Sequence, residues 1–436
     1  MKLSRVLAVG TLIREAFSFW TGHPFDFELW VRVGYYTARG FSPYGILPGA
    51  PGLSFANVFS ISSTATIGYL PFWPFVAAGA YDLYSLVGFG NRFVYYFLLK
   101  QPIIASDIAV AYLLYLVVKR HRPERALWAA EVWTFLPLSI IFSSIWGMFD
   151  SIAMALVLVA LLSASVSSKS AFSGLATFAK SIPLIYAIPL TLGNPRRWWG
   201  ILVAVLIPVA LTFGISAIMG WSISDVFRVT ASTVSKGGGS MSVFTIVNYL
   251  EYLGTIVPQT VDQLWVLNYL WIPAVLIGTV VAARAYGLRS DAAVIKVMLV
   301  ATLLFLIFKS QVNEQYSVYL LVLGLLDVSL IQPKRIRLLA ATAVVVMVYL
   351  LANNLLMLRF TAPIYSEATL VDYTLDLQYA FYRFTIELIA GVAFTLLNVA
   401  YLVSLWRDHS GRGDAREAST TGASDSRQSD PLSPRA

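Results

Sequence analysis

The chain has 436 residues, of which 58% are hydrophobic and 12% charged, and its formal net charge is +8. Soluble domains carry roughly 25% charged residues, so this composition excludes a water-soluble globular protein and indicates a membrane protein. The absence of cysteine excludes disulfides and thiolate chemistry, and the histidines (His23, His121 and His409) are too scattered for a zinc motif. In a membrane protein, positive charge is typical of basic cytoplasmic loops, and we do not expect nucleic acid as a partner.

Five stretches without Asp, Glu, Lys or Arg predict membrane-spanning helices, because about 18 uncharged apolar residues are enough to cross a bilayer. They are residues 151–168, 198–224, 263–283, 338–358 and 388–406. None of them alternates in polarity, as the strands of a membrane barrel would. The sequence therefore predicts an all-α polytopic membrane protein.

In chain order, the apolar pattern predicts about ten full spans, and the first is expected to stay uncleaved because Arg14 and Glu15 interrupt it. The spans are expected near residues 5–19, 94–118, 126–145, 150–166, 200–219, 264–284, 292–308, 316–331, 338–357 and 380–404. Basic residues gather in connectors, which the positive-inside rule puts on the cytoplasmic side: residues 119–125, 196–197, 284–289 and 334–337. Residues 1–406 then form one transmembrane domain with both ends inside, and residues 407–436 are expected to be a disordered cytoplasmic tail.

The predicted outer loops are residues 20–93, 220–262 and 359–378. Within the long first loop, residues 27–38 predict a short amphipathic helix. The apolar segment 65–86 is expected to lie in the membrane interface rather than to cross, because Pro71 and Pro74 interrupt it.

Residues 171–195 are ambiguous between one span and a hairpin of two half-helices broken at Lys180–Pro183. A single crossing would move Arg196 and Arg197 to the outer side and invert the orientation of every later span. We favour the hairpin, and broken helices of this kind occur where they line a cavity.

Polar side chains at the outer helix ends are candidates for function, because ionisable groups at the edge of a membrane are costly. They are Asp26, Glu28, Asp150, Lys180, Lys309, Glu314, Gln315 and Tyr316. Asp26 falls at the start of the short helix, where it can accept a proton from a hydroxyl group or simply cap the helix. Glu28 points away from Asp26 on a helix and shares its side in an extended segment, and the sequence leaves both open.

Six segments, in order, resemble the GT-C superfamily of polytopic glycosyltransferases, and most of all the catalytic subunit of GPI mannosyltransferase I and its prokaryotic relatives. They are DFELWVRVGYYTARGFSPY, YLPFWPF, KQPIIASDIAVAYLL, LPLSIIFSSIWGMFDSI, GLATFAKSIPLIYAIPL and FKSQVNEQYSVYLL. The family has a DxD-type motif in the first outer loop, and this chain has Glu28 at its second position. Met148 stands where relatives often have Gln, whereas Asp150, Lys180 and Pro183 match.

This resemblance implies a glycosyltransferase that moves mannose or another hexose from a polyprenyl (dolichyl) phosphate to an acceptor hydroxyl on a lipid or glycan, with inversion. Asp26 would be the general base and Glu28 its partner in the motif. Lys180, Lys309 and His23 would bind the donor phosphate, although Lys309 can also be an interfacial anchor. Substrate would be bound by Asp150, Trp146, Glu314, Gln315, Tyr316 and the matching acid Asp107, with Trp146 either stacking on a sugar or lying as an interfacial aromatic.

Several points stay open in the sequence. A divalent cation, Mg or Mn, at Asp26 and Glu28 is compatible with oxygen ligands, and a small accessory membrane subunit is compatible with the resemblance. The main alternative function is a multi-span transporter or a flippase for lipid-linked sugars. A non-catalytic subunit of a glycosylation complex is a second alternative. We expect the plasma membrane of a prokaryote, such as an archaeon, rather than the endoplasmic reticulum, with the active site facing outward.

Overall fold

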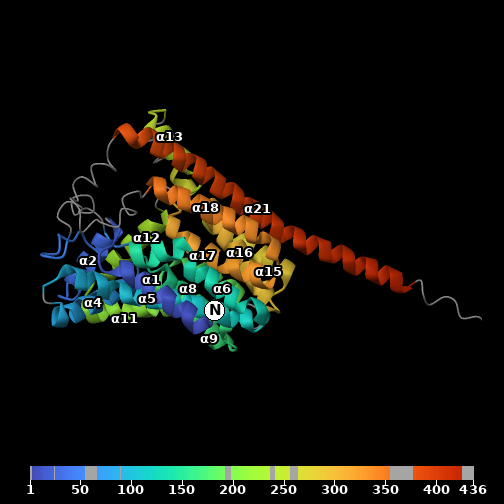
Figure 1. The fold of residues 1–436 in the computed structure, drawn as a ribbon, viewed down its shortest axis with the longest axis horizontal. Coiled ribbons are helices and arrows are strands. Elements are labelled where there is room, and N and C mark those ends of the chain that lie inside the picture. The colour runs from blue at the N-terminus through green and yellow to red at the C-terminus, as the bar shows by residue number, and fades with distance from the viewer. Residues whose placement is uncertain are drawn as a thin grey trace, which may run out of the picture.

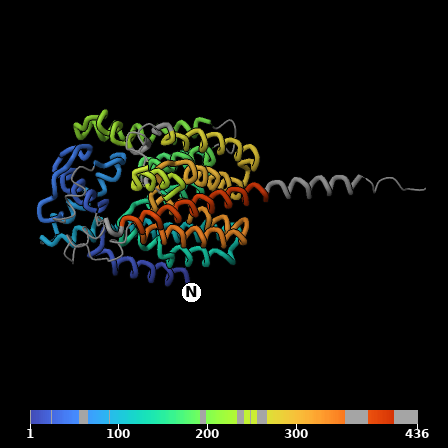
Figure 2. Tube along the Cα trace, turned by 90° about the horizontal axis from the view of Figure 1, so that it is seen from above, coloured from blue at the N-terminus to red at the C-terminus, as the bar shows by residue number. Residues whose placement is uncertain are grey.

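The computed structural model describes residues 2–23, 25–54, 66–88, 90–191, 198–235, 241–255, 264–353 and 377–424, and every regular element in these ranges is a helix. The long helices run side by side in one bundle, and two shorter ones, α2 (Asp26–Thr37) and α4 (Phe72–Val87), lie together at one end (Figure 1). α1 (Leu3–Ser18) follows one edge of the bundle and α11 (Trp199–Met219) the opposite edge (Figure 2).

Each of the ten predicted spans corresponds to a helical segment. Besides α1 and α11, the helices concerned are α5 (Arg92–Lys119), α6 (Pro123–Phe135), α8 (Asp150–Leu162), α15 (Trp271–Tyr286), α16 (Asp291–Phe308), α17 (Ser317–Leu330), α18 (Ile336–Asn353) and α21 (Leu377–Ser424). Two further helices, α12 (Ile223–Ser235) and α13 (Thr245–Tyr252), fall in the predicted outer loop 220–262.

Within the described residues, six helices are long and apolar enough to cross a membrane, and a seventh span results if the bent pair that begins with α6 is counted as one. The protein is therefore a multi-pass integral membrane protein. The number of helices that meet this length is below the ten predicted spans, because α1, α8 and α17 have only 16, 13 and 14 residues. At 1.5 Å per residue these helices are shorter than a hydrocarbon core of about 30 Å.

The span predicted over residues 126–145 is broken. α6 ends at Phe135, and a short helix α7 (Pro137–Ile140) and a π-helical turn η1 (Ile141–Trp146) continue at an angle of 53°. Pro137 causes the break, because it has no N–H to donate and forces Leu136 into an extended conformation.

The hairpin predicted over residues 171–195 is visible in the path of the chain. α9 (Val166–Ala179) ends before Lys180, whose backbone is extended, and the chain continues in η2 (Ile182–Tyr186) and α10 (Ala187–Thr191). The chain has turned back by Thr191, because Gly200 packs against both Thr191 and Ser170 of α9. Residues 192–197, which complete the predicted hairpin, lie outside the described residues.

The short helix predicted at residues 27–38 is α2, and α4 covers most of the segment predicted to lie in the interface. Aromatic rings pack these helices onto the bundle. Trp73 of α4 stacks on Phe149, which precedes α8, with 4.2 Å between ring centroids, and Trp30 of α2 meets both rings edge-on. This packing fixes the beginning of α2, where Asp26 lies, against the beginning of α8.

The C-terminal helix α21 is held by a buried cluster at the end of the bundle opposite α2. Arg335 donates to Asp327 at 2.7 Å, and Tyr401 of α21 donates to the same carboxylate at 2.8 Å. The helix continues to Ser424, where the sequence predicts disorder from residue 407 onward (Figure 1). Residues 425–436 lie outside the described part of the chain.

Candidate active site

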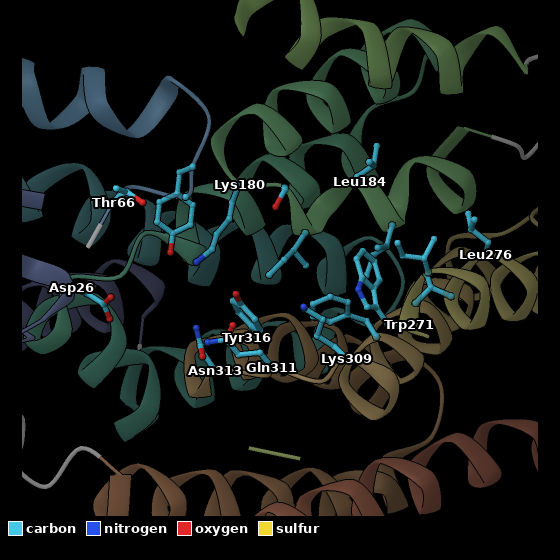
Figure 3. A pocket seen from close by; sticks show the side chains of 18 of the residues that line it. Asp26, Thr66, Lys180, Leu184, Trp271, Leu276, Lys309, Gln311, Asn313 and Tyr316 are labelled. Atoms are coloured by element: carbon cyan, nitrogen blue, oxygen red, sulfur yellow. The ribbon is translucent and has the colours of Figure 1, made fainter. Parts of the chain in front are cut away.

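A cavity of about 530 Å³ opens between α2, the break at Lys180, α15 and the segment that joins α16 to α17. Its polar lining comes from Asp26, Thr66, Tyr69, Lys180, Ser181, Lys309, Gln311, Asn313 and Tyr316. Its apolar lining includes Leu184, Ile185, Ile188, Trp271, Val275 and Leu276. The two sets occupy different ends, with Asp26 at one end, Leu276 at the other and Lys309 between them (Figure 3).

Asp26 is the first residue of α2, and its side chain is 23% exposed. The indole Nε1–H of Trp146 donates to its Oδ2 atom at 3.0 Å. The backbone N–H of Asp26 is bonded to Nδ1 of His23 at 2.9 Å, and the His23 ring stacks on Trp146 with 4.7 Å between centroids. His23 therefore caps the helix, and the Asp26 carboxylate faces the cavity.

Lys180 and Asp150 form a buried ion pair, with Nζ 2.6 Å from Oδ2. The ammonium group also lies within 5.5 Å of the ring centroids of Tyr69, Phe149 and Tyr316. Lys180 lines the cavity, whereas Asp150 lies behind it and is 1% exposed. The carboxylate of Asp150 thus compensates the charge of Lys180, and Asp150 is placed to act on a ligand through Lys180.

Lys309 follows the last residue of α16 and is 4% exposed. Burial lowers the pKa of Lys309 to about 8, because the charged form loses its hydration. Its neighbours in the sequence, Gln311 and Asn313, also line the cavity and bring hydrogen-bonding groups to the same wall.

Seven of the predicted site residues do not line the cavity, and one of them is Asp150, which lies behind Lys180. Glu28 points away from Asp26, because residues two apart on a helix point in different directions. Its side chain is fully buried, with Oε1 3.8 Å from Nε of Arg32. His23 and Trp146 lie behind Asp26, as described above. The others are Asp107, paired with Arg14 at 2.6 Å; Glu314, which accepts from Asn353 at 2.8 Å; and Gln315, which is buried.

The side chains around Asp26 provide few ligands for a divalent cation. The helical start of α2 separates the carboxylates of Asp26 and Glu28, and only Asp26 faces the cavity. In the part of the chain that the structure describes, no group of three His, Asp or Glu side chains is placed to hold a metal ion. The residues present therefore do not fit the carboxylate pair expected for Mg or Mn.

Sequence reasoning missed part of the cavity wall. Three residues of this wall, Tyr69, Gln311 and Asn313, belong to the motifs YLPFWPF and FKSQVNEQY. Their place in these motifs could have indicated that they belong to the site. The contribution of Trp271 and Leu276 had no signal in the sequence, because it depends on how α15 packs beside the hairpin.

A scan against models of protein families finds no match to this chain, and a search of curated proteins finds no similar sequence. Fold and cavity define a multi-pass membrane protein with a pocket that is polar at one end and apolar at the other.

Proposed function

We propose that the protein is a membrane glycosyltransferase that moves a hexosyl group from a polyprenyl phosphate to an acceptor hydroxyl, as its resemblance to the GT-C superfamily implies. One observation carries the proposal. A single cavity joins a carboxylate, Asp26, and a lysine, Lys309, to an apolar groove on a helix long enough to cross the membrane. A lipid-linked sugar consists of a sugar, a phosphate and an apolar chain, and these three parts would lie at Asp26, at Lys309 and in the groove, in that order.

The apolar groove suits the lipid of such a donor. Trp271, Val275 and Thr279 recur every four residues along α15 and form one face of this helix. Opposite them lies Leu184 of η2, and both Leu184 and Leu276 are largely exposed, at 43% and 51%. The groove is therefore open along its edge, where a polyprenyl chain can enter from the surrounding lipid.

The lysines suit the phosphate. A phosphate that leaves from the anomeric carbon gains negative charge in the transition state, and a nearby cation stabilises that charge. Both Lys180 and Lys309 line the cavity, and we assign this role to the two lysines together. Lys180 would donate a hydrogen bond to the phosphate while it keeps its pairing with Asp150.

Asp26 suits the role of general base. In the proposed step, the acceptor oxygen attacks the anomeric carbon from the face opposite the phosphate, and the bond from that carbon to the phosphate oxygen breaks. The acceptor proton passes to Asp26, so one displacement inverts the configuration. Trp146 engages Oδ2, and we assign the proton transfer to Oδ1. Hydrogen-bonding groups near Asp26, including Asn313 and Tyr316, would orient the sugar.

The proposal can be tested with purified protein in lipid vesicles, labelled polyprenyl-phosphate hexoses and a panel of acceptors. Asp26→Asn is expected to abolish transfer, because the amide cannot take up the proton. Asp82→Asn is the matched control, because Asp82 is an exposed carboxylate on the neighbouring helix α4. Full transfer by Asp26→Asn would remove Asp26 as the base. Movement of the lipid-linked sugar between leaflets without any transfer would favour the flippase instead.

The proposed orientation puts α2 and the cavity on the outer side of a prokaryotic plasma membrane. Because the chain has no cysteine, single cysteines report on this directly. In intact cells, Ser42→Cys is expected to react with a reagent that does not cross the membrane, whereas Ser168→Cys is expected to react only after the cells are opened. The reverse pattern would place the cavity on the cytoplasmic side.

A further inference from the structure

We propose that the buried ion pair of Arg14 and Asp107 positions the carboxylate of Asp26, and that it acts through the broken helix that carries Trp146. The chemical role of Asp26 in this inference rests on the proposed function. The positioning itself rests only on contacts between side chains and backbone atoms of this protein. Neither Arg14 nor Asp107 lines the cavity, so both are positioning residues rather than groups that touch a substrate.

Arg14 of α1 joins the two sides of the break at Leu136. Its Nη1 donates to the backbone oxygen of Thr134 in α6 at 3.0 Å, and its Nη2 donates to Oγ of Ser139 in α7 at 3.0 Å. Ser139 in turn donates to the backbone oxygen of Trp133 at 2.7 Å. Pro137 deprives the end of α6 of a backbone donor, and these side chains replace it, so the angle of the break depends on them.

Asp107 of α5 holds the next part of the same segment. Its Oδ2 accepts from Nε of Arg14 at 2.6 Å and from Oγ of Ser143 in η1 at 3.3 Å. Its backbone oxygen accepts from the indole of Trp133 at 3.1 Å. Arg14 and Asp107 together therefore contact α6, α7 and η1, which are the three elements that lead to Trp146.

The π-helical turn η1 delivers Trp146 to Asp26. Turns of this kind are rare and often occur at functional sites. η1 is followed by Gly147, whose φ of +85° is a conformation that glycine adopts readily. The backbone oxygen of Trp146 accepts from the N–H of His23 at 3.2 Å, and its indole donates to Asp26. A shift of η1 therefore moves both the donor to the carboxylate and the residue that caps α2.

The burial of this ion pair favours a positioning role over a stabilising one, because burying two charges has a large desolvation cost and contributes little net stability. When one partner is removed, the other is left as an uncompensated charge inside the bundle. Asp107→Asn is thus expected to rearrange the contacts of Arg14, and with them the angle at Leu136.

A thiol at position 26 reports on the contact with Trp146, and this measurement does not require enzymatic activity. In the Asp26→Cys background, whose thiol is the only one in the chain, Trp146 can donate to the thiolate. Adding Asp107→Asn is expected to lower the rate of reaction with a small charged methanethiosulfonate at pH 7 about tenfold, because the thiolate loses this donor. Ser139→Ala, a milder change that removes one contact of Arg14, is expected to lower the rate less.

Asp327→Asn is the matched control for these variants. It removes the same kind of charge from a buried arginine pair, Arg335–Asp327, at the far end of the bundle. It is expected to leave the thiol rate unchanged. The inference is overturned if Asp107→Asn and Ser139→Ala also leave the rate unchanged, or if Asp327→Asn lowers it equally.

Transfer kinetics provide the second measurement. If Asp107 acts through Trp146, the kcat of the double variant Trp146→Phe/Asp107→Asn is expected to be no lower than that of Trp146→Phe alone, because the two changes remove the same interaction. Multiplicative effects would contradict the relay. If the unaltered protein transfers no sugar while the thiol rates change as expected, the proposed function fails and the positioning stands.

Discussion

Nζ of Lys180 lies 2.6 Å from Oδ2 of Asp150, and the two side chains are only 2% and 1% exposed. Lys180 is the residue at the break of the hairpin, and Asp150 is the first residue of α8. The pair therefore fixes the hairpin to the bundle and presents the ammonium group to the cavity.

This pair gives the first prediction. Asp150→Asn is expected to lower the free energy of unfolding by about 3–5 kcal/mol, because it leaves a buried lysine without its counter-charge. The double variant Lys180→Met/Asp150→Leu is expected to recover most of that loss, since apolar groups of similar size replace both charges. Chemical denaturation in detergent measures both. A single variant as stable as the unaltered protein would contradict the prediction.

The same double variant separates stability from function. If Lys180 contacts the donor phosphate, the folded double variant is expected to show a KM for the donor raised about tenfold or more, because a hydrogen bond to a charged group is lost. An unchanged KM in a stable double variant would limit Lys180 to a structural role.

The pH dependence of donor binding gives the second prediction, through Lys309. Its pKa of about 8 means that the ammonium form is present below that pH and is lost as the pH rises through it. We therefore expect kcat/KM for the donor to fall above pH 8, because the phosphate then meets a neutral amine. Lys309→Arg keeps its charge over the whole range and is expected to abolish the decline. A decline of equal size in Lys309→Arg would assign the titration to another group.

These predictions depend on contacts that the sequence specifies unequally. The helix that starts at Asp26 and the break at Lys180 were predictable, because local signals specify them: an amphipathic period in the first and a polar Lys-Ser-Ile-Pro interruption in the second. The bend at Leu136 was also readable from Pro137, but the long apolar run around it favoured a single span over residues 126–145.

Partners across the bundle were not predictable. Asp150 was a candidate for binding substrate, yet its carboxylate faces Lys180, which lies 30 residues along the chain. Asp107 likewise faces Arg14 across 93 residues. A charged residue in an apolar segment indicates that a partner exists, and only the packing of helices identifies the partner. For the same reason, the sequence does not indicate that α15 forms a wall of the cavity.

The apolar groove gives the third prediction. Leu276→Trp is expected to raise the KM for donors with long polyprenyl chains about tenfold, because a larger side chain at this position occupies the groove. A donor with only one or two isoprene units is expected to be affected little. Ile277→Trp is the matched control, because Ile277 is 65% exposed on the same helix and does not line the cavity. Equal effects on long and short donors would show that the chain does not lie along α15.

Glu28 gives the last prediction, since the resemblance makes it a catalytic partner of Asp26, whereas its carboxylate is fully buried beside Arg32. Arg32 also donates to the backbone oxygen of Leu47 at 2.8 Å, so it connects α2 to the loop that follows. Glu28→Gln is expected to lower the melting temperature and to keep most of the turnover per folded molecule, because the cavity does not include this side chain. Turnover normalised to folded protein, measured beside Asp26→Asn, distinguishes the two roles. If Glu28→Gln folds normally and loses turnover as completely as Asp26→Asn, the two carboxylates act together, and α2 must rearrange when the substrate binds.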